Sequence, residues 1–493
     1  MTGPLRTAPE SPTGTRWWPD PVLIGLGAAL VRIPSLFAPT QLGYDDGGYG
    51  LAAIAMRQGY EPFRDIFSPQ GPLFLPLVHA ADRIGLEAQN APRLLSVTAG
   101  VVVAIAVYAI AAQLMDRGRA RLAGGLTAAS GILLWTTGPL TGDGPAAAFA
   151  TTAIAVAVAY RRAPSRARAA AVTVLAGCAI STKSLLVGPA LLIAWLLVAH
   201  RRRIVDLLMI PIGAVAIVVA LALPWGTENV LDDYVRYHLD KTSNRKPFSN
   251  LEKLFNTYRR RDAFLTALAA WALVSRLLFH SWPSGPGRSG PARRARARYS
   301  RNPVSDTRFL WWWAGLVFVV LTLQDPMFRN HLSALAAPAA LLVARYRPSW
   351  RVVTVVGLVT IPIQVITLHP LLLPADFQGD GARIVNELRT LPRHAWALSD
   401  EPGLVWRAGL GTDPFFVDPS VLRLDSTVDA IKITEGRIVR AAQHRRVCAV
   451  AITAPERFGR YPNLGDRLRA LGYRREVALE DRLGLYVADR CRP

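Results

Sequence analysis

Long apolar segments recur along the first three quarters of this 493-residue sequence, and they constrain its fold more than any other feature. A helix needs roughly 20 predominantly apolar residues to cross a bilayer. By this measure we expect about eleven spans, several of them short. The segments lie near residues 21–38, 91–115, 119–137, 144–160, 167–182, 184–199, 204–224, 263–281, 308–324, 331–345 and 351–369. They predict a mostly α-helical, polytopic transmembrane bundle over residues 21–370.

The formal net charge of +22 comes largely from arginines that cluster on alternate loops of this bundle. Arg117 to Arg121, Arg161 to Arg168 and the loop at residues 282–307 are examples. Basic loops stay in the cytoplasm, so the pattern predicts a cytoplasmic N-terminus, with a disordered tail over residues 1–20, and an exterior C-terminus. Because these arginines follow membrane spans, we expect no nucleic-acid partner.

Residues 375–493 have ordinary globular composition and predict a soluble α/β domain on the exterior side. Alternating patterns indicate strands at 395–399, 447–452, 474–479 and 484–488, with a helix at 464–471. The domain holds two of the three cysteines, Cys448 and Cys491, and the sequence leaves open whether they pair. We expect the domain to serve in acceptor recognition or structural support.

Ionisable residues gather at the exterior ends of the predicted spans. Two longer exterior segments are expected, at 39–90 with an acidic motif and at 225–262, the latter interpreted as a connector lying at the membrane interface. The outstanding residues are Asp45 and Asp46, Asp143, Lys183, Arg329 and His331. Charges at a membrane boundary are costly, so their accumulation on one face favours a site for a charged substrate.

Such a set suits glycosyl transfer from a lipid-linked sugar phosphate. A carboxylate accepts the proton of an attacking hydroxyl, while lysine and arginine neutralise the departing phosphate. One base is enough for inversion, the outcome we favour; a retaining route would need a second carboxylate, for which Asp46 and Asp143 are available. The sequence identifies no cofactor and leaves metal dependence open, since adjacent carboxylates can hold Mg²⁺ or Mn²⁺.

An ordered set of short motifs resembles a known superfamily. The acidic pair Asp45-Asp46 with Tyr49 comes first, then Ser68-Pro69-Gln70-Gly71-Pro72, Arg93-Leu94-Leu95-Ser96, Asp143, Thr182-Lys183 and Arg329-Asn330-His331. In this order they resemble the integral-membrane C-type glycosyltransferases, in the protein O-mannosyltransferase and lipid A aminoarabinose transferase branch. Two motifs depart from that branch: Asp46 stands where glutamate is usual, and Ser68-Pro69-Gln70 replaces a lysine-proline-proline sequence.

The resemblance implies roles for nine residues. Asp45 would be the base, supported by Asp46 and Asp143; Lys183, Arg93 and Arg329 would contact the donor phosphate; Tyr49, Gln70 and His331 would bind substrate.

The resemblance also implies substrates and a location. The donor would be a mannose- or arabinose-type sugar on polyprenyl phosphate, and the acceptor a cell-envelope glycan, lipid or protein, at the exterior face of a bacterial plasma membrane. Two rival interpretations remain: a polytopic lipid or sugar transporter or flippase, and a non-catalytic envelope assembly protein.

Overall fold

The computed structural model describes residues 19–184, 187–199, 204–239, 249–280, 307–324, 327–423, 432–480 and 482–492. Nearly all of the predicted cytoplasmic tail and of the predicted basic loop lie outside these residues.

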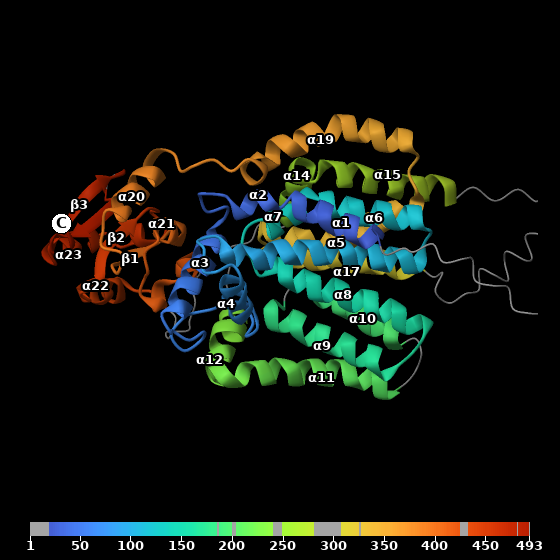
Figure 1. Ribbon diagram of the computed structural model, residues 1–493, viewed down its shortest axis with the longest axis horizontal. Coiled ribbons are helices and arrows are strands. Elements are labelled where there is room, and N and C mark those ends of the chain that lie inside the picture. The colour runs from blue at the N-terminus through green and yellow to red at the C-terminus, as the bar shows by residue number, and fades with distance from the viewer. Residues whose placement is uncertain are drawn as a thin grey trace, which may run out of the picture.

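The larger part of the structure is a bundle of apolar helices that run along the long axis of the molecule (Figure 1). Its helices are α1 (Pro19–Leu30), α2 (Ile33–Leu36), α5 (Leu94–Leu114), α6 (Arg117–Ala129), α7 (Gly131–Thr137), α8 (Asp143–Arg162), α9 (Arg166–Thr182), α10 (Gly188–Ala199), α11 (Ile204–Ala222), α15 (Ala263–His280), α17 (Arg308–Leu323), α18 (Ala336–Tyr346) and α19 (Trp350–Leu372). The bundle confirms the mostly helical architecture.

Four helical segments of the described chain are long and apolar enough to cross a membrane: Ala91–Leu114, Asp143–Arg162, Ile204–Trp225 and Trp350–Leu372. Shorter apolar helices accompany them. Only 17% of the α11 and α19 windows is buried inside the protein, against 72% for α8. An apolar helix with so little protein cover needs another apolar surrounding, which a bilayer would supply.

Several predicted spans are interrupted, and the interruptions have local causes. The segment at 21–38 divides at Arg32, which is fully buried and donates to the carbonyls of Ala28 and Ala128 near the ends of α1 and α6. Helix carboxyl ends carry partial negative charge, so they stabilise this cation in the absence of a contacting carboxylate. The segment at 119–137 divides at Ser130, whose hydroxyl caps α7 by accepting from the Leu133 amide.

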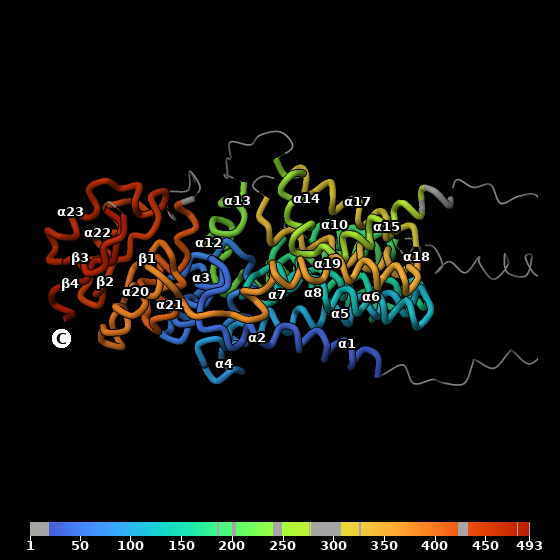
Figure 2. Tube along the Cα trace, turned by 90° about the horizontal axis from the view of Figure 1, so that it is seen from above, coloured from blue at the N-terminus to red at the C-terminus, as the bar shows by residue number. Residues whose placement is uncertain are grey.

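A layer of short elements covers one end of the bundle (Figures 1 and 2). These elements are α3 (Tyr44–Arg57), α4 (Phe74–Ile84), the 3₁₀ turn η1 (Ala91–Arg93), α12 (Thr227–Val230), the π-helix η3 (Leu231–Arg236), α13 (Tyr237–Leu239), α14 (Ser249–Arg261) and the 3₁₀ helix η5 (Arg329–Leu335). The layer therefore brings together the two segments predicted to be exterior, 39–90 and 225–262.

The C-terminal domain lies beyond this layer and contains a four-stranded sheet of order β1-β2-β4-β3. The strands are β1 (Trp396–Ser399), β2 (Val447–Ile452), β3 (Tyr473–Ala478) and β4 (Gly484–Ala488). The first pair is parallel and the other two are antiparallel. The helices are α20 (Gly379–Arg389), α21 (Pro402–Ala408), α22 (Glu435–Gln443) and α23 (Leu464–Ala470). The predicted strands and the predicted helix are confirmed to within two residues at each end.

Cys448 and Cys491 form a disulfide that joins β2 to the end of the chain, 43 residues later. Closing a loop of this length restricts the unfolded chain and stabilises the fold by about 4 kcal/mol in the chain-entropy model. We therefore expect reductant to lower the stability of this domain by about that amount, measured by denaturant unfolding. The double variant Cys448→Ala/Cys491→Ala is the control, because reductant should no longer change its unfolding curve.

Candidate functional site

The two acidic residues at the start of α3 occupy different environments. Asp46 is fully buried and pairs with Arg93, whose Nε lies 3.0 Å from Asp46 Oδ1. The backbone amides of Leu42 and Leu140 also donate to the Asp46 carboxylate, each over 2.9 Å. Burial, the largest single influence, would raise the pKa of Asp46, but the charge and hydrogen bonds of Arg93, the charge of Arg407 and the Leu42 amide together hold that pKa below its usual value. Asp46 is thus a fixed anion that joins the start of α3, the turn η1 that carries Arg93, and the loop before α8 that carries Leu140.

Asp45 is only partly buried and lies on the side of α3 that faces the bundle. Asn330 Nδ2 of η5 contacts its Oδ2 at 3.5 Å, the long end of the hydrogen-bond range. One helical turn along, Tyr49 shares this side, since residues i and i+4 lie on one face. Burial, followed by the Asp45 and Asp418 carboxylates, raises the pKa of Tyr49, so its phenol stays protonated beside these acids. Asp45 is therefore the more accessible of the two carboxylates.

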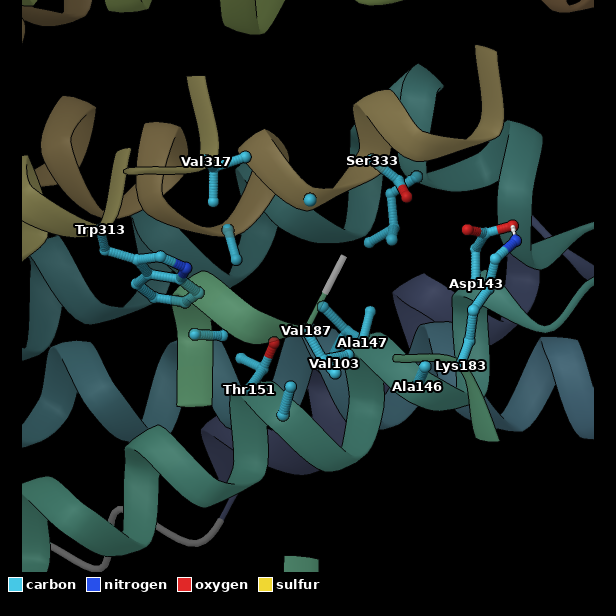
Figure 3. A pocket seen from close by; sticks show the side chains of 15 residues that line it. Val103, Asp143, Ala146, Ala147, Thr151, Lys183, Val187, Trp313, Val317 and Ser333 are labelled. Carbon is cyan, nitrogen blue, oxygen red and sulfur yellow. Dashed lines mark hydrogen bonds and ion pairs between the residues drawn. The ribbon is translucent and has the colours of Figure 1, made fainter. Parts of the chain in front are cut away.

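Asp143 and Lys183 close one end of an apolar pocket (Figure 3). Lys183 Nζ lies 2.9 Å from Asp143 Oδ2, while Asp143 Oδ1 is buried and has no hydrogen-bond partner among the residues that the structure describes. The pocket contains about 520 Å³ of space between protein atoms, including its open mouth. Its walls come from α5, α8, α10, α17 and α18, and Trp313 and Val317 lie at the end away from the ion pair. The pocket thus joins an apolar channel between helices to a charged head.

The segment Ser68-Pro69-Gln70-Gly71-Pro72, here called the proline-rich motif, is fixed to the end of α9, next to Lys183. The Gly71 amide donates to the Thr182 carbonyl over 3.1 Å, and the Leu73 amide donates to the Ser181 carbonyl over 2.8 Å. Gln70, which precedes Gly71 in the chain, donates from Nε2 to the Tyr49 hydroxyl over 2.7 Å. Its Oε1 is buried without a hydrogen-bond partner and would lie 2.9 Å from a Cβ on Gly142. Gln70 and Asp143 therefore present two unused buried acceptors close together.

A cluster of three cations lies where α14 meets the start of the short helix η5. Arg329 is exposed at its start, and Lys253 and Arg261 of α14 approach from the side. Burial and the neighbouring Arg329 lower the pKa of Lys253, and the same two causes lower the pKa of Arg261 to about 10. Within the described residues none of the three forms an ion pair with a carboxylate. Such an arrangement favours an anion.

Helix η5 connects the parts of the site. Its Arg329 belongs to the cation cluster, its Asn330 contacts Asp45, and its Ser333 lines the pocket that holds Asp143 and Lys183. His331, between them, is 3% exposed and its Nδ1 pairs with the side-chain amide of Gln324. This ring therefore lies within the packing that supports η5.

The structure brings all nine predicted site residues to the end of the bundle where α3, η5 and the end of α9 meet, with Asp46, Arg93 and His331 buried in its supporting packing. Arg93 uses its nitrogens on Asp46 and on the carbonyls of Ser35, Ala38 and Thr40, so it is not directed at a substrate. Sequence reasoning missed Lys253 and Arg261, which stood in a segment interpreted as a connector, and Asp418, which the C-terminal domain places beside Gly48.

The segment at 225–239 also holds the proline-rich motif in place. Asp233 of the π-helix η3 is 6% exposed and accepts from the Ser68 amide over 3.1 Å. Phe67 packs edge-on to Tyr237 with ring centroids 5.2 Å apart, and Tyr234 donates to the Ile180 carbonyl over 2.6 Å. These contacts give the predicted connector a structural role next to Lys183.

Asp233 predicts a pH dependence of stability. Burial raises the pKa of Asp233 from 3.8 to about 7, with Asp232 adding to the rise and the Ser68 amide opposing it. The folded state then binds a proton that the unfolded state releases, so stability falls as pH rises from about 4 through 7. We expect a higher unfolding midpoint at about pH 5 than at pH 8, and a smaller difference in Asp233→Asn. Equal differences in the two proteins would contradict this assignment.

The acidic pair does not offer a shared metal site. Both oxygens of Asp46 already accept from Arg93 and backbone amides, so Asp46 is not disposed to share a metal ion with Asp45. In the part of the chain that the structure describes, no group of three or more His, Cys, Asp or Glu residues is arranged to hold a metal ion. The donor set around Asp45 thus does not fit the oxygen-rich shell that Mg²⁺ or Mn²⁺ prefers.

Comparison with known proteins gives a match to one family model over part of the chain and a similar fold over nearly all of it. Residues 70–227 match the family model described as dolichyl-phosphate-mannose-protein mannosyltransferase. No curated protein matches the sequence. The structure is similar to ArnT from Cupriavidus metallidurans bound to undecaprenyl phosphate, at 13% identity, with a TM-score of 0.63 over 97% of this chain and 100% of that one.

Two further crystal structures show the same likeness. ArnT in the apo state covers 96% of this chain and 99% of its own, at 14% identity and a TM-score of 0.62. The Archaeoglobus fulgidus oligosaccharyltransferase in complex with Zn and sulfate covers 90% of this chain and 69% of its own, at 15% identity and a TM-score of 0.50. The match to the mannosyltransferase family over residues 70–227 and the ArnT fold over nearly the whole chain confirm the resemblance to integral-membrane C-type glycosyltransferases.

Proposed function

We propose that this protein is a membrane glycosyltransferase that moves a mannose- or arabinose-type sugar from polyprenyl phosphate to a cell-envelope acceptor. The observation that carries the proposal is the apolar pocket between helices, which ends at Asp143 and Lys183. Helix η5 links this end to Asp45, because its Ser333 lines the pocket and its Asn330 contacts the Asp45 carboxylate. A lipid-linked sugar has the same division into a long apolar part and a polar, charged head. The family match and the undecaprenyl phosphate bound to ArnT support a donor of this class.

The proposed reaction is a single displacement at the anomeric carbon. Asp45 removes the proton of the acceptor hydroxyl as the new glycosidic bond forms, and the bond to the carrier phosphate breaks on the opposite face of the sugar. The polyprenyl phosphate leaves with both electrons of that bond, stabilised by cations. The product has inverted configuration.

Individual residues take roles that their surroundings support. Lys183 and Arg329 contact the phosphate. We add Lys253 and Arg261 as candidates, because these two cations lack a carboxylate partner in the described structure. Asp143 orients Lys183, and its free oxygen together with Gln70 Oε1 accepts from sugar hydroxyls. Tyr49 positions Gln70, and His331 positions Gln324, through the hydrogen bonds that join their side chains. We assign Arg93 and Asp46 to positioning α3, since each already has its partners.

The proposed topology keeps about eleven spans, with some crossings made by two consecutive short helices. The N-terminus is cytoplasmic, and the active end of the bundle and the domain at 375–493 lie outside a bacterial plasma membrane. The disulfide between Cys448 and Cys491 supports this side, because disulfides persist in oxidising compartments.

Detergent-purified protein incubated with radiolabelled polyprenyl-phosphate sugars and membrane extracts tests the function. Label transferred to an extracted acceptor supports it, and the product identifies the donor and acceptor classes. The same donors in proteoliposomes separate the rivals: translocation of the intact lipid without transfer would indicate a flippase, and neither activity would indicate an assembly protein.

Chelation tests the metal question separately. Because the acidic pair does not fit a metal, we expect the transfer rate to survive exhaustive treatment with EDTA. A rate that disappears with EDTA and returns with added Mg²⁺ or Mn²⁺ would contradict this expectation.

A further inference from the structure

The C-terminal domain packs directly against the helix that carries the acidic pair, through α21. The contact is closest at two glycines of α3 that lie one turn apart. A Cβ on Gly47 would lie 2.4 Å from the backbone nitrogen of Gly403, and a Cβ on Gly50 would lie 2.3 Å from the Trp406 ring. Real Cβ atoms do not approach other atoms this closely, so only glycine allows this separation of the two helices. The neighbouring Gly48 differs, since its Cβ would meet nothing nearer than 3.5 Å.

Trp406 occupies the centre of this contact and is 1% exposed. The guanidinium of Arg407 lies 3.7 Å from its ring centroid, and that of Arg93 lies 5.3 Å away. Cations over an aromatic face are attracted to its ring electrons, most strongly where water is excluded. Arg93 in turn holds Asp46, the neighbour of the proposed base. A continuous chain of contacts therefore runs from the C-terminal domain to the first turn of α3.

Polar contacts surround this apolar centre. Gln41 donates to Glu401 over 2.8 Å, Gln89 donates to the Trp406 carbonyl over 2.9 Å, and Arg407 donates to Asn90 over 2.6 Å. One cluster of buried apolar side chains includes residues of α3 and α4 together with those of the sheet. This interface resembles the interior of one domain more than a contact between two mobile ones.

The two faces of α3 carry residues with different roles. Asp45 and Tyr49, four residues apart, share the face toward the bundle, whereas Gly47 and Gly50, three residues apart, share the face toward α21. Any displacement of α21 against the glycine face is therefore transmitted to Asp45 by a rigid turn of helix.

We infer that α21, and Trp406 above all, is a positioning element for the proposed base, so that the C-terminal domain is a fixed part of the reaction site. The catalytic part of this inference depends on the function proposed above. Its structural part, that Trp406 fixes α3, does not. A reacting group displaced by about 1 Å can lose on the order of 10²-fold in rate.

Gly50→Ala tests the inference, with Gly48→Ala as the matched control on the same helix. Alanine normally favours a helix over glycine, so without the Trp406 contact Gly50→Ala would slow hydrogen exchange in α3. We expect the opposite: faster exchange over residues 44–57 and a kcat lower by on the order of 10²-fold, with little change in the KM for donor. Gly48→Ala, which meets no such contact, should show exchange no faster than the wild type and an unchanged kcat.

A second variant provides the rescue. Phenylalanine is smaller than tryptophan, so Gly50→Ala/Trp406→Phe should recover slow exchange and part of the kcat lost in Gly50→Ala. Should Gly50→Ala fail to fold, Trp406→Phe alone is expected to lower kcat at unchanged donor KM. Exchange and kcat that stay at wild-type values in a folded Gly50→Ala would overturn the inference.

Failure of the proposed function would look different. If the wild type transfers no sugar while Gly50→Ala still speeds exchange in α3, the fixing of α3 stands and the glycosyltransferase assignment falls. If the wild type transfers sugar and Gly50→Ala changes neither exchange nor kcat, the inference falls and the function stands.

Discussion

Asp45→Asn is expected to lower the rate of sugar transfer by about 10²–10⁴-fold, the usual contribution of a general acid or base. Asparagine keeps the shape of the side chain but has no lone pair basic enough to take the acceptor proton. Asp45 is only partly buried, and its side chain contacts the Asn330 amide at the long end of the hydrogen-bond range, so the variant should fold normally.

Initial rates with a radiolabelled polyprenyl-phosphate sugar measure this effect, and an unfolding curve of each protein in the same detergent verifies the fold. Asp466→Asn is the matched control, because its side chain is 69% exposed on the C-terminal domain. Wild-type turnover in Asp45→Asn would remove Asp45 from its proposed role.

Arg93→Met is expected to have the largest effect on stability, about 3–5 kcal/mol, because it leaves the Asp46 carboxylate buried without its counter-ion. Both side chains of this pair are 0% exposed. A denaturant titration in detergent measures the loss. The control is Arg383→Met, which removes a pair 58% and 63% exposed and should change stability by about 0–1 kcal/mol.

The double variant Asp46→Leu/Arg93→Met distinguishes a lost ion pair from general damage to the packing. Replacing both partners by apolar groups avoids the unpaired charge, so the double variant should be more stable than Arg93→Met alone. Additive losses would show that the pair is not the source of the effect.

The two predictions separate adjacent residues that the sequence could not separate. Asp45 and Asp46 form one motif, in which the resemblance predicts Asp45 as the base and Asp46 as its support in the same reaction. Their difference arises from helix phase and from Arg93, which is 47 residues away along the chain. A consecutive pair on a helix points in two directions about 100° apart, and only the packing decides which one is buried.

The C-terminal strands were predictable because alternation and the glycine at the end of a helix are local signals. The interruptions of the membrane segments were harder, since Arg32 and Ser130 look like tolerated polar residues in an apolar run until their partners are known. Lys253 and Arg261 carried no signal beyond a charged, amphipathic segment. Their importance comes from packing against η5, whose Leu332 follows Tyr258 of α14 by 74 residues in the chain. The Leu332 carbonyl of η5 accepts a hydrogen bond from Tyr258.

The shared core of α3 and α21 limits how such proteins can diversify. A chimera joined in the connection between α19 and α20 would place a foreign helix against Gly47 and Gly50, where even one methyl group is too large. A new outer module could be grafted only together with residues 41–93, the surface into which it fits. We therefore expect recombination at the apparent domain boundary to give poorly packed proteins. Residues 41–93 and the C-terminal domain must evolve together.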